Sequence, residues 1–176
     1  MAATRILSIV GRKNAGKTTL AVALADEFAR KGRRVMMMKH AANTVDLDRG
    51  GSDSARHLNE GKAERVLVES PGVRTIIERR SEEAGPEELA RRYFDGADIV
   101  LAEGFSSAPI PKIEVFRRAA SDTPLYQPTL PGAALWVAIV TDDDRFEANC
   151  PVLRFRDTMW LQLLANMAWE RAKVLE

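Results

Sequence analysis

The run SIVGRKNAGKTTL, Ser8–Leu20, constrains the fold of this chain more than any other segment. Residues 6–10 form a short apolar run of the kind that makes a buried parallel strand. The period then changes, because Leu20, Leu24 and Phe28 recur every four residues with charged residues on the other faces, as on an amphipathic helix. A strand, a glycine turn and a helix in this order predict the first unit of an α/β fold.

Within this turn, Gly11, Gly16, Lys17 and Thr18 spell G-x-x-x-x-G-K-T, the P-loop pattern. The glycines let the backbone curl until its N–H groups face phosphate oxygens, and the positive end of the following helix faces the same anion. The lysine supplies a charge for the β- and γ-phosphates, and the threonine hydroxyl is a Mg²⁺ ligand. The pattern therefore predicts a nucleoside triphosphate site in which Lys17 acts in catalysis. The expected phosphate contacts are Gly11, Asn14, Ala15, Gly16, Lys17, Thr18 and Thr19.

Strand-like and helical runs alternate along the rest of the chain. The strand-like runs cover residues 35–38, 63–70, 73–80, 99–102, 111–118, 134–141 and 151–156. One helix is expected after Ser52 or Asp53 as its cap, and another begins near Pro86. A third, near the C-terminus, is expected to have Asp157 as its cap. Most of the strands are apolar on both faces, which is typical of a parallel sheet covered on both sides. We therefore expect the P-loop nucleoside triphosphatase fold, a mostly parallel sheet with helices on both faces, as a single domain over residues 1–176.

Polar residues stand at the ends of several strand-like runs. Lys39 and His40 end the second run, Glu103 ends the run at 99–102, and Asp142 follows a later one. Because the carboxyl ends of parallel strands meet at one edge of a sheet, we expect these side chains beside the glycine turn. Glu103 is either a carboxylate that serves Mg²⁺ or its waters, or a solvated strand end.

The loop after the second strand carries Asp46 and Asp48 at alternate positions. They either reach the metal or are ordinary loop acids. A second function is also consistent with these acids. The chain could be a small-molecule kinase that uses ATP or GTP, with Asp46 or Asp48 as the base that activates the acceptor. The arginines that would form its lid are Arg74, Arg79, Arg80, Arg91 and Arg92. The sequence has no N/T-K-x-D guanine signature, so the residues alone leave the choice of base open.

Composition limits the partners and the compartment. The chain has 26 Lys and Arg against 25 Asp and Glu, a net charge of +1, so its bulk charge does not attract nucleic acid or a membrane surface. No apolar run approaches the length of a membrane span. The single cysteine, Cys150, excludes an internal disulfide, and with two histidines the chain has few ligands for zinc, nickel or cobalt. We expect a cytoplasmic protein with no nucleic-acid or membrane partner.

Several motifs of this chain occur together in one known family. They are GRKNAGKTT at 11–19, KH at 39–40, DLDRGGSDSARH at 46–57, VLAEGF at 100–105, PKIEVFR at 111–117 and VTDD at 140–143. Their ordered combination resembles the molybdopterin-guanine dinucleotide biosynthesis protein B family, MobB, over essentially the whole chain. The P-loop is generic, whereas the ordered set is specific.

The resemblance implies a P-loop GTPase-like fold that forms a homodimer, binds GTP with Mg²⁺ and hydrolyses it weakly. It also implies work beside the guanylyltransferase MobA, which joins GMP to molybdopterin, and beside molybdopterin-handling proteins. In this family the B protein assists as an adaptor or nucleotide supplier and does not perform the transfer. The implied function is a GTP-binding accessory protein of molybdenum cofactor biosynthesis, a weak GTPase at most.

Residue by residue, the resemblance assigns Thr18 and Glu103 to Mg²⁺. It places Asp46, Asp48, Asp53 and Ser54 in a loop near the γ-phosphate, with Asp46, Asp48 and Glu103 in catalysis. The further nucleotide contacts that it implies are Lys39, His40, Thr141 and Asp142.

The chain also departs from the family pattern. Ala41, Ala42 and Asn43 stand where histidines are usual, and Ser52 and Ser106 stand where lysines are usual. If the usual groups bind a pterin phosphate, the affinity or identity of that ligand differs here.

Overall fold

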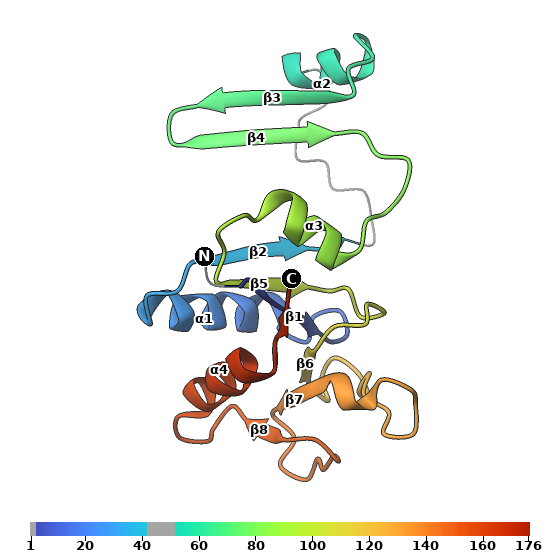
Figure 1. Cartoon of the computed structure of the whole chain (residues 1–176). Coiled ribbons are helices and arrows are strands. Elements are labelled where there is room, and N and C mark those ends of the chain that lie inside the picture. Colours follow the sequence, from blue (N-terminus) through green and yellow to red (C-terminus); the bar gives the residue numbers. More distant parts are fainter. Residues whose placement is uncertain (1–2, 42–51) are drawn as a thin grey trace. The chain divides into compact units, whose positions relative to one another are not determined.

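Figure 1 shows the computed structural model of the chain, which describes residues 3–41 and 52–176. The chain forms two compact units. The first contains Met1–His40 and Gly85–Glu176, and the second contains Ala41–Ala84. The P-loop and the strand ends that follow from the sequence all belong to the first unit.

Some of the sequence-based expectations fall on residues 42–51, outside the described part of the chain. They concern Asp46 and Asp48 as loop acids near the γ-phosphate, and the departures at Ala42 and Asn43. These expectations stay predictions, as does the single nucleotide-binding domain.

The first unit is built on a sheet with the strand order β2-β5-β1-β6-β7-β8, and β9 pairs with β1. Among the described strands of this sheet the pairs are parallel, except that β9 is antiparallel to β1. The bounds are β1 (Arg5–Val10), β2 (Val35–Lys39), β5 (Ile99–Glu103), β6 (Lys112–Phe116), β7 (Trp136–Thr141), β8 (Val152–Arg154) and β9 (Lys173–Val174). Strand β1 is buried along almost its whole length because other strands flank it and helices cover it. The predicted mostly parallel sheet is confirmed.

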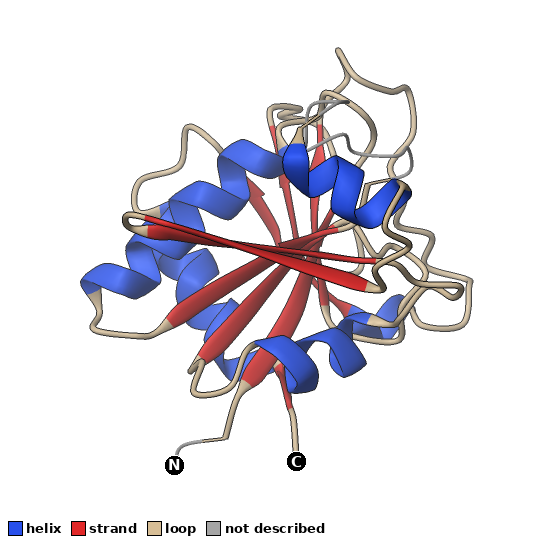
Figure 2. Ribbon diagram, turned by 90° about the horizontal axis from the view of Figure 1, so that it is seen from above, coloured by secondary structure: helices blue, strands red, loops and turns tan. Residues whose placement is uncertain are grey.

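Helices lie on both faces of this sheet, as the view from above shows (Figure 2). They are α1 (Lys17–Arg30), α3 (Pro86–Tyr93) and α4 (Trp160–Arg171), with a short 3₁₀ turn, η1 (Ala133–Leu135). Leu7 and Ile9 of β1 pack in one core with residues of α1 and α4, whereas Ile6 packs with Ala90 of α3. This alternation along β1 is the period of a strand between two layers. Among the described residues, no helix has the length and apolar character needed to cross a membrane.

The start of the last helix differs from the expectation. Asp157 was predicted as its cap, but α4 begins at Trp160, and Met159 precedes it in the left-handed region with φ 60°. The Asp157 carboxylate instead accepts a hydrogen bond from the Arg154 amide at 2.8 Å. A short acidic side chain readily bonds to nearby backbone in this way. Asp157 therefore closes the turn after β8, and the predicted cap is wrong.

The second unit contains a helix and a two-stranded antiparallel sheet. Helix α2 (Asp53–Asn59) is capped by Ser52, whose hydroxyl accepts a hydrogen bond from the Ala55 amide at 3.1 Å. Strands β3 (Arg65–Ser70) and β4 (Val73–Glu78) form a hairpin through the predicted Pro-Gly turn. The sequence identified all three elements, because their caps and turns are local signals.

Candidate nucleotide site

The P-loop of the first unit has a backbone that only glycine permits at two positions. Gly11 has φ 148°, and a Cβ there would lie 2.4 Å from the carbonyl oxygen of Val115 on β6. Gly16 has φ 102° and is the N-cap of α1, which has no side-chain cap among the described residues. The N–H groups of the first turn of α1 therefore remain for an anion. The loop has the form that the G-x-x-x-x-G-K-T pattern predicts.

Lys17 lies across this loop. Its ammonium group donates a hydrogen bond to the carbonyl oxygen of Arg12 at 2.9 Å, and both groups are exposed. A phosphate offers the ammonium a stronger, charge-assisted partner than a neutral carbonyl does. The side chain is thus already at the loop and is free to exchange this bond for a ligand.

The end of β5 meets the start of α1 through Glu103. The Thr18 hydroxyl lies 2.8 and 2.9 Å from the two carboxylate oxygens of Glu103. The Lys39 ammonium lies 2.9 Å from one of these oxygens and 3.4 Å from the Thr18 hydroxyl. The parallel pairing of β5 with β1 and β2, which aligns Glu103 with Ile9 and Lys39, brings the three side chains together.

The same three side chains allow a test of whether Mg²⁺ fits. A hydroxyl and a carboxylate are oxygen ligands of the kind that Mg²⁺ requires in phosphate sites. Glu103 is 7% exposed, so its charge needs a cation nearby, and Lys39 supplies one at the position that the carboxylate and Thr18 share. The residues present therefore fit a magnesium ion. Within residues 3–41 and 52–176 no three His, Cys, Asp or Glu side chains are grouped to hold a metal by themselves.

His40 follows β2 and continues its pairing. Its amide donates to the carbonyl oxygen of Glu103 at 2.9 Å, and its ring lies 5.1 Å from that of Phe105. Gly104 lies directly against His40, with a virtual Cβ 3.2 Å from its side chain. His40 thus shapes the turn after β5, and its role as a nucleotide contact stays a prediction.

Thr141 ends β7 and Asp142 follows it, on the opposite side of β1 from Glu103. The Thr141 hydroxyl is buried and accepts a hydrogen bond from the Asp143 amide at 3.0 Å, so it holds the turn. Asp142 is exposed and lies 3.8 Å from Arg117. The Arg118 guanidinium donates to Asp143 at 2.7 Å and lowers the pKa of that carboxyl group.

Asp53 and Ser54 lie in the first turn of α2 in the second unit. The Ser54 hydroxyl is 3.1 Å from that of Ser52. Their role near a γ-phosphate stays a prediction, as does that of Asp46 and Asp48.

Sequence reasoning missed two residues of this region. Ser8 lies inside β1, and its hydroxyl donates to the carbonyl oxygens of Ala102 and Gly104, which fixes the end of β5 beside the P-loop. Arg117 follows β6 and packs over Gly16. Arg117 is the last residue of the run PKIEVFR, but no spacing rule links it to the P-loop.

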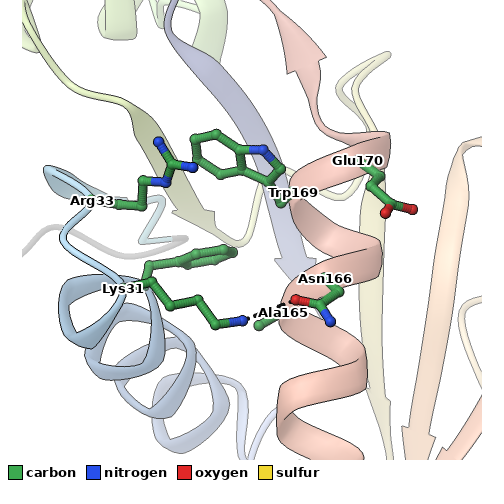
Figure 3. A pocket seen from close by; sticks show the side chains of 7 residues that line it. Lys31, Arg33, Ala165, Asn166, Trp169 and Glu170 are labelled. Atoms are coloured by element: carbon green, nitrogen blue, oxygen red, sulfur yellow. Dashed lines mark hydrogen bonds between the residues drawn. The ribbon is translucent and has the colours of Figure 1, made fainter.

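A hollow of about 150 Å³ lies far from the P-loop, toward the C-terminal ends of α1 and α4 (Figure 3). Three of the polar side chains that line it already have partners. Lys31 donates to Asn166 at 2.9 Å, and the Arg33 guanidinium lies 4.1 Å from the ring centre of Trp169. These contacts join the two helices, and the hollow is not part of the nucleotide site.

Comparison with known families decides where this chain belongs. Residues 6–142 match the family model described as Molybdopterin guanine dinucleotide synthesis protein B. The chain belongs to this family. The matched range contains the P-loop, Lys39, Glu103 and Asp142.

Two members of the family match this chain over segments of similar length. The molybdopterin-guanine dinucleotide biosynthesis adapter protein of Haemophilus influenzae is 33% identical over 115 residues, which are 64% of this chain and 64% of that protein. The protein of the same description from Escherichia coli is 28% identical over 121 residues, 68% of this chain and 69% of that protein. The chain thus matches somewhat less than two thirds of the length of the Haemophilus relative.

Solved structures share the fold over a longer span. The crystal structure of Bacillus subtilis MobB covers 93% of this chain and 97% of its own length, with a TM-score of 0.67 and 21% identity. A MobB homologue from Bacillus stearothermophilus has a TM-score of 0.65 and 23% identity and covers 94% of this chain and 99% of its own. The expected family and fold class are both confirmed.

Proposed function

We propose that this protein binds GTP with Mg²⁺ and acts as an accessory protein in molybdopterin guanine dinucleotide biosynthesis. The observation that carries the proposal is the pairing of a P-loop with the Thr18–Glu103 contact at the same sheet edge. Its relatives from Haemophilus influenzae and Escherichia coli are described as adapter proteins of this biosynthesis.

The chain's own residues divide the work of holding the nucleotide. The amides of the loop from Gly11 to Thr18 and the Lys17 ammonium bind the phosphates. Thr18 and Glu103 would hold the metal, at the position where the Lys39 ammonium lies. Bound Mg²⁺ neutralises part of the phosphate charge.

We propose weak hydrolysis and no transfer reaction. In the described part of the chain, the side chain that contacts the Thr18–Glu103 pair is Lys39. No glutamine or arginine of the described residues bonds to this pair. A glutamine that orients water and an arginine that stabilises the transferred phosphoryl group are what fast GTPases use. Slow turnover suits a protein that presents a nucleotide to a partner.

The partners in this proposal are a MobA-like guanylyltransferase, a molybdopterin-handling protein and a second copy of this chain, in the cytoplasm. The hairpin of β3 and β4 supports the homodimer. Leu67 and Ile76 are paired across it and are 55% and 49% exposed. Apolar side chains on a two-stranded sheet gain most when another surface covers them. Cys150 is a free thiol, which suits a reducing compartment.

The kinase alternative receives no support from the arginines expected in its lid. Arg74 pairs with Glu69 within the hairpin, and Arg79 donates to Leu58 and Asn59, also in the second unit. Arg91 donates to the C-terminal residue Glu176 in the first unit. These three arginines are divided between the two units, and each bonds to residues of its own unit.

Calorimetric titration of the intact chain with GTP and ATP, each with and without Mg²⁺, tests the nucleotide proposal. We expect GTP with Mg²⁺ to bind most tightly, and no binding of either nucleotide would overturn it. Titration with the guanylyltransferase then tests the adapter role, for which we expect a complex. Rapid single-turnover GTP hydrolysis by the isolated chain, or a phosphorylated metabolite formed from labelled ATP, would contradict an accessory role.

A further inference from the structure

Arg117 lies between the P-loop and the loop that follows β8. Its Cζ and Nε atoms are 3.9 and 4.0 Å from the position that a Cβ on Gly16 would occupy. On its other side, Cζ is 4.6 Å from the ring centre of Phe155. The guanidinium thus rests on an aromatic ring and borders the start of α1, where the nucleotide is proposed to bind.

Within the described part of the chain, the Nε atom of Arg117 has no hydrogen-bond partner. It is the one buried side-chain nitrogen or oxygen there of which this is true. The nearest carboxylate oxygen, on Asp142, is 3.8 Å away, too far for a hydrogen bond. The side chain as a whole is 41% exposed. Packing on Phe155 and Gly16 holds this arginine, which leaves the outer donors of its fork for a ligand.

The neighbourhood of Arg117 favours a base over a phosphate. The groups assigned to the phosphates and the metal, Lys17, Thr18 and Glu103, lie at the start of α1 and on the β5 side of β1. Arg117 and Asp142 follow β6 and β7, on the other side of β1, and Arg117 reaches the start of α1 only at Gly16. A carboxylate beside the arginine repels a phosphate but accepts hydrogen bonds from the N–H groups of a base.

The donor and acceptor match guanine best. An arginine fork donates to guanine O6 and N7, the commonest specific contact of this residue with a base. A carboxylate next to the arginine accepts hydrogen bonds from the ring N–H and the amino group of guanine, which lie on the edge beside O6. Adenine carries an amino group where guanine has O6, so it presents a donor to a donor at this position.

We propose that Arg117, resting on Phe155 and working beside Asp142, binds the guanine base and selects GTP over ATP. This inference rests on the proposed function, because it assigns the base end of the same site. It gives the chain a device for guanine recognition in place of the absent N/T-K-x-D signature.

The first test compares Arg117→Ala with Arg118→Ala in the full chain. Arg118 is the matched control, because it is the next residue, is exposed and pairs with Asp143. Affinities are measured for GTP, ATP and inorganic tripolyphosphate with Mg²⁺. We expect Arg117→Ala to weaken GTP about tenfold to a hundredfold, to leave tripolyphosphate unchanged and to reduce the preference for GTP over ATP. Arg118→Ala should change none of the three.

Two results would overturn the assignment of Arg117 to the base. One is an equal loss for GTP and tripolyphosphate, which would make it a phosphate contact. The other is an unchanged GTP affinity in Arg117→Ala. If the unaltered chain binds neither GTP nor tripolyphosphate, the proposed function itself fails, and this is a separate outcome. Thermal unfolding of each variant confirms that it folds, and Arg117→Lys, which keeps the charge without the planar fork, should also lose GTP preference.

A second test uses the base directly. Xanthine carries a carbonyl where guanine carries its amino group, so Asp142→Asn should bind XTP more tightly and GTP less tightly than the unaltered chain does. A rise in XTP affinity identifies Asp142 as the partner of that edge of the base. If the unaltered chain and Asp142→Asn had the same ratio of GTP affinity to XTP affinity, Asp142 would not be a contact of the base.

Discussion

The hydroxyl of Thr18 lies within hydrogen-bond distance of both carboxylate oxygens of Glu103, at 2.8 and 2.9 Å. Thr18 is in the first turn of α1, and Glu103 is the last residue of β5, 85 positions later. The parallel pairing of β1 with β5 sets this approach. A hydroxyl and a carboxylate of the kind that Mg²⁺ requires are thus in place beside the P-loop.

Lys17→Ala should abolish tight nucleotide binding without unfolding the chain. The Lys17 side chain is exposed and its bond to the Arg12 carbonyl is local, whereas its charge-assisted bonds to phosphate would be lost. Such bonds are worth about 1.5–3 kcal/mol, so we expect GTP affinity to fall roughly a hundredfold in calorimetry. Lys31→Ala, at the far end of α1, is the control and should bind GTP normally. Unchanged GTP binding in Lys17→Ala would contradict the site.

Glu103→Gln should remove most of the effect of Mg²⁺ on GTP binding. The amide keeps the size of the side chain but loses the charge that holds the metal. Loss of an outer-shell partner of a metal ligand weakens metal affinity about tenfold to a hundredfold, and we expect at least this much for a group assigned to the metal itself. The measurement is GTP affinity as a function of Mg²⁺ concentration, with Glu147→Gln, an exposed site, as control. An unaltered Mg²⁺ dependence in Glu103→Gln would exclude Glu103 from the metal site.

Gly11→Ala should destabilise the chain and disturb the P-loop together. The new Cβ would lie 2.4 Å from the Val115 carbonyl oxygen, so β6 or the loop must move. We expect a loss of about 3 kcal/mol in the free energy of unfolding, measured with urea. Gly32→Ala is the control, because Gly32 also has a positive φ, 73°, but no atom lies near its virtual Cβ. Its cost should be only the roughly 1–2 kcal/mol that a left-handed conformation costs a residue with a Cβ, and equal losses at both positions would contradict the proposed clash.

Glu114 should give the stability of the chain a specific pH dependence. This carboxylate is buried on β6 and accepts hydrogen bonds from the Leu125 and Tyr126 amides and from Trp136. Burial raises the pKa of Glu114 above its ordinary value of 4.5. The folded state therefore binds this proton more tightly than the unfolded state does, and the stabilisation is complete below pH 4.5 and is lost as pH rises through the folded pKa.

The measurement is urea unfolding of the unaltered chain and of Glu114→Gln from pH 4 to pH 7. Other carboxylates titrate alike in both proteins, so the difference between their free energies of unfolding reports Glu114. We expect the unaltered chain to lose stability relative to the variant as pH rises from about 4.5. A difference that is constant with pH, or that moves the other way, would show that the carboxylate is ionised equally easily in the folded state.

Leu67→Asp should weaken self-association. Leu67 faces Ile76 across the hairpin, between the ion pairs Arg65–Glu78 and Glu69–Arg74. A charge at this position must lose water if a second copy covers the hairpin. We expect a shift from dimer to monomer in sedimentation, whereas Leu163→Asp, equally exposed on α4, should leave the dimer intact. A dimer that survives Leu67→Asp would place the interface elsewhere.

The parts that were predictable are those in which neighbours along the chain determine the structure. The P-loop is one continuous run, and its glycines, its lysine and the helix that follows are local requirements. The Ser52 cap of α2 and the Pro-Gly turn between β3 and β4 are of the same kind. Asp157 shows where such local prediction fails. The same short side chain can cap a helix or close a turn, and here it bonds to the Arg154 amide and not to the start of α4.

The sequence by itself determined the alternation of strands and helices, the phosphate-binding loop and the set of polar strand ends, since apolar periodicity and turn chemistry depend on a few consecutive residues. Only the tertiary structure decided which strand ends are neighbours. The order β2-β5-β1-β6-β7 brings Lys39 and Glu103 to one side of the P-loop and Arg117 and Asp142 to the other. Strand order arises from the packing of whole faces against helices, a property that no short window of sequence contains.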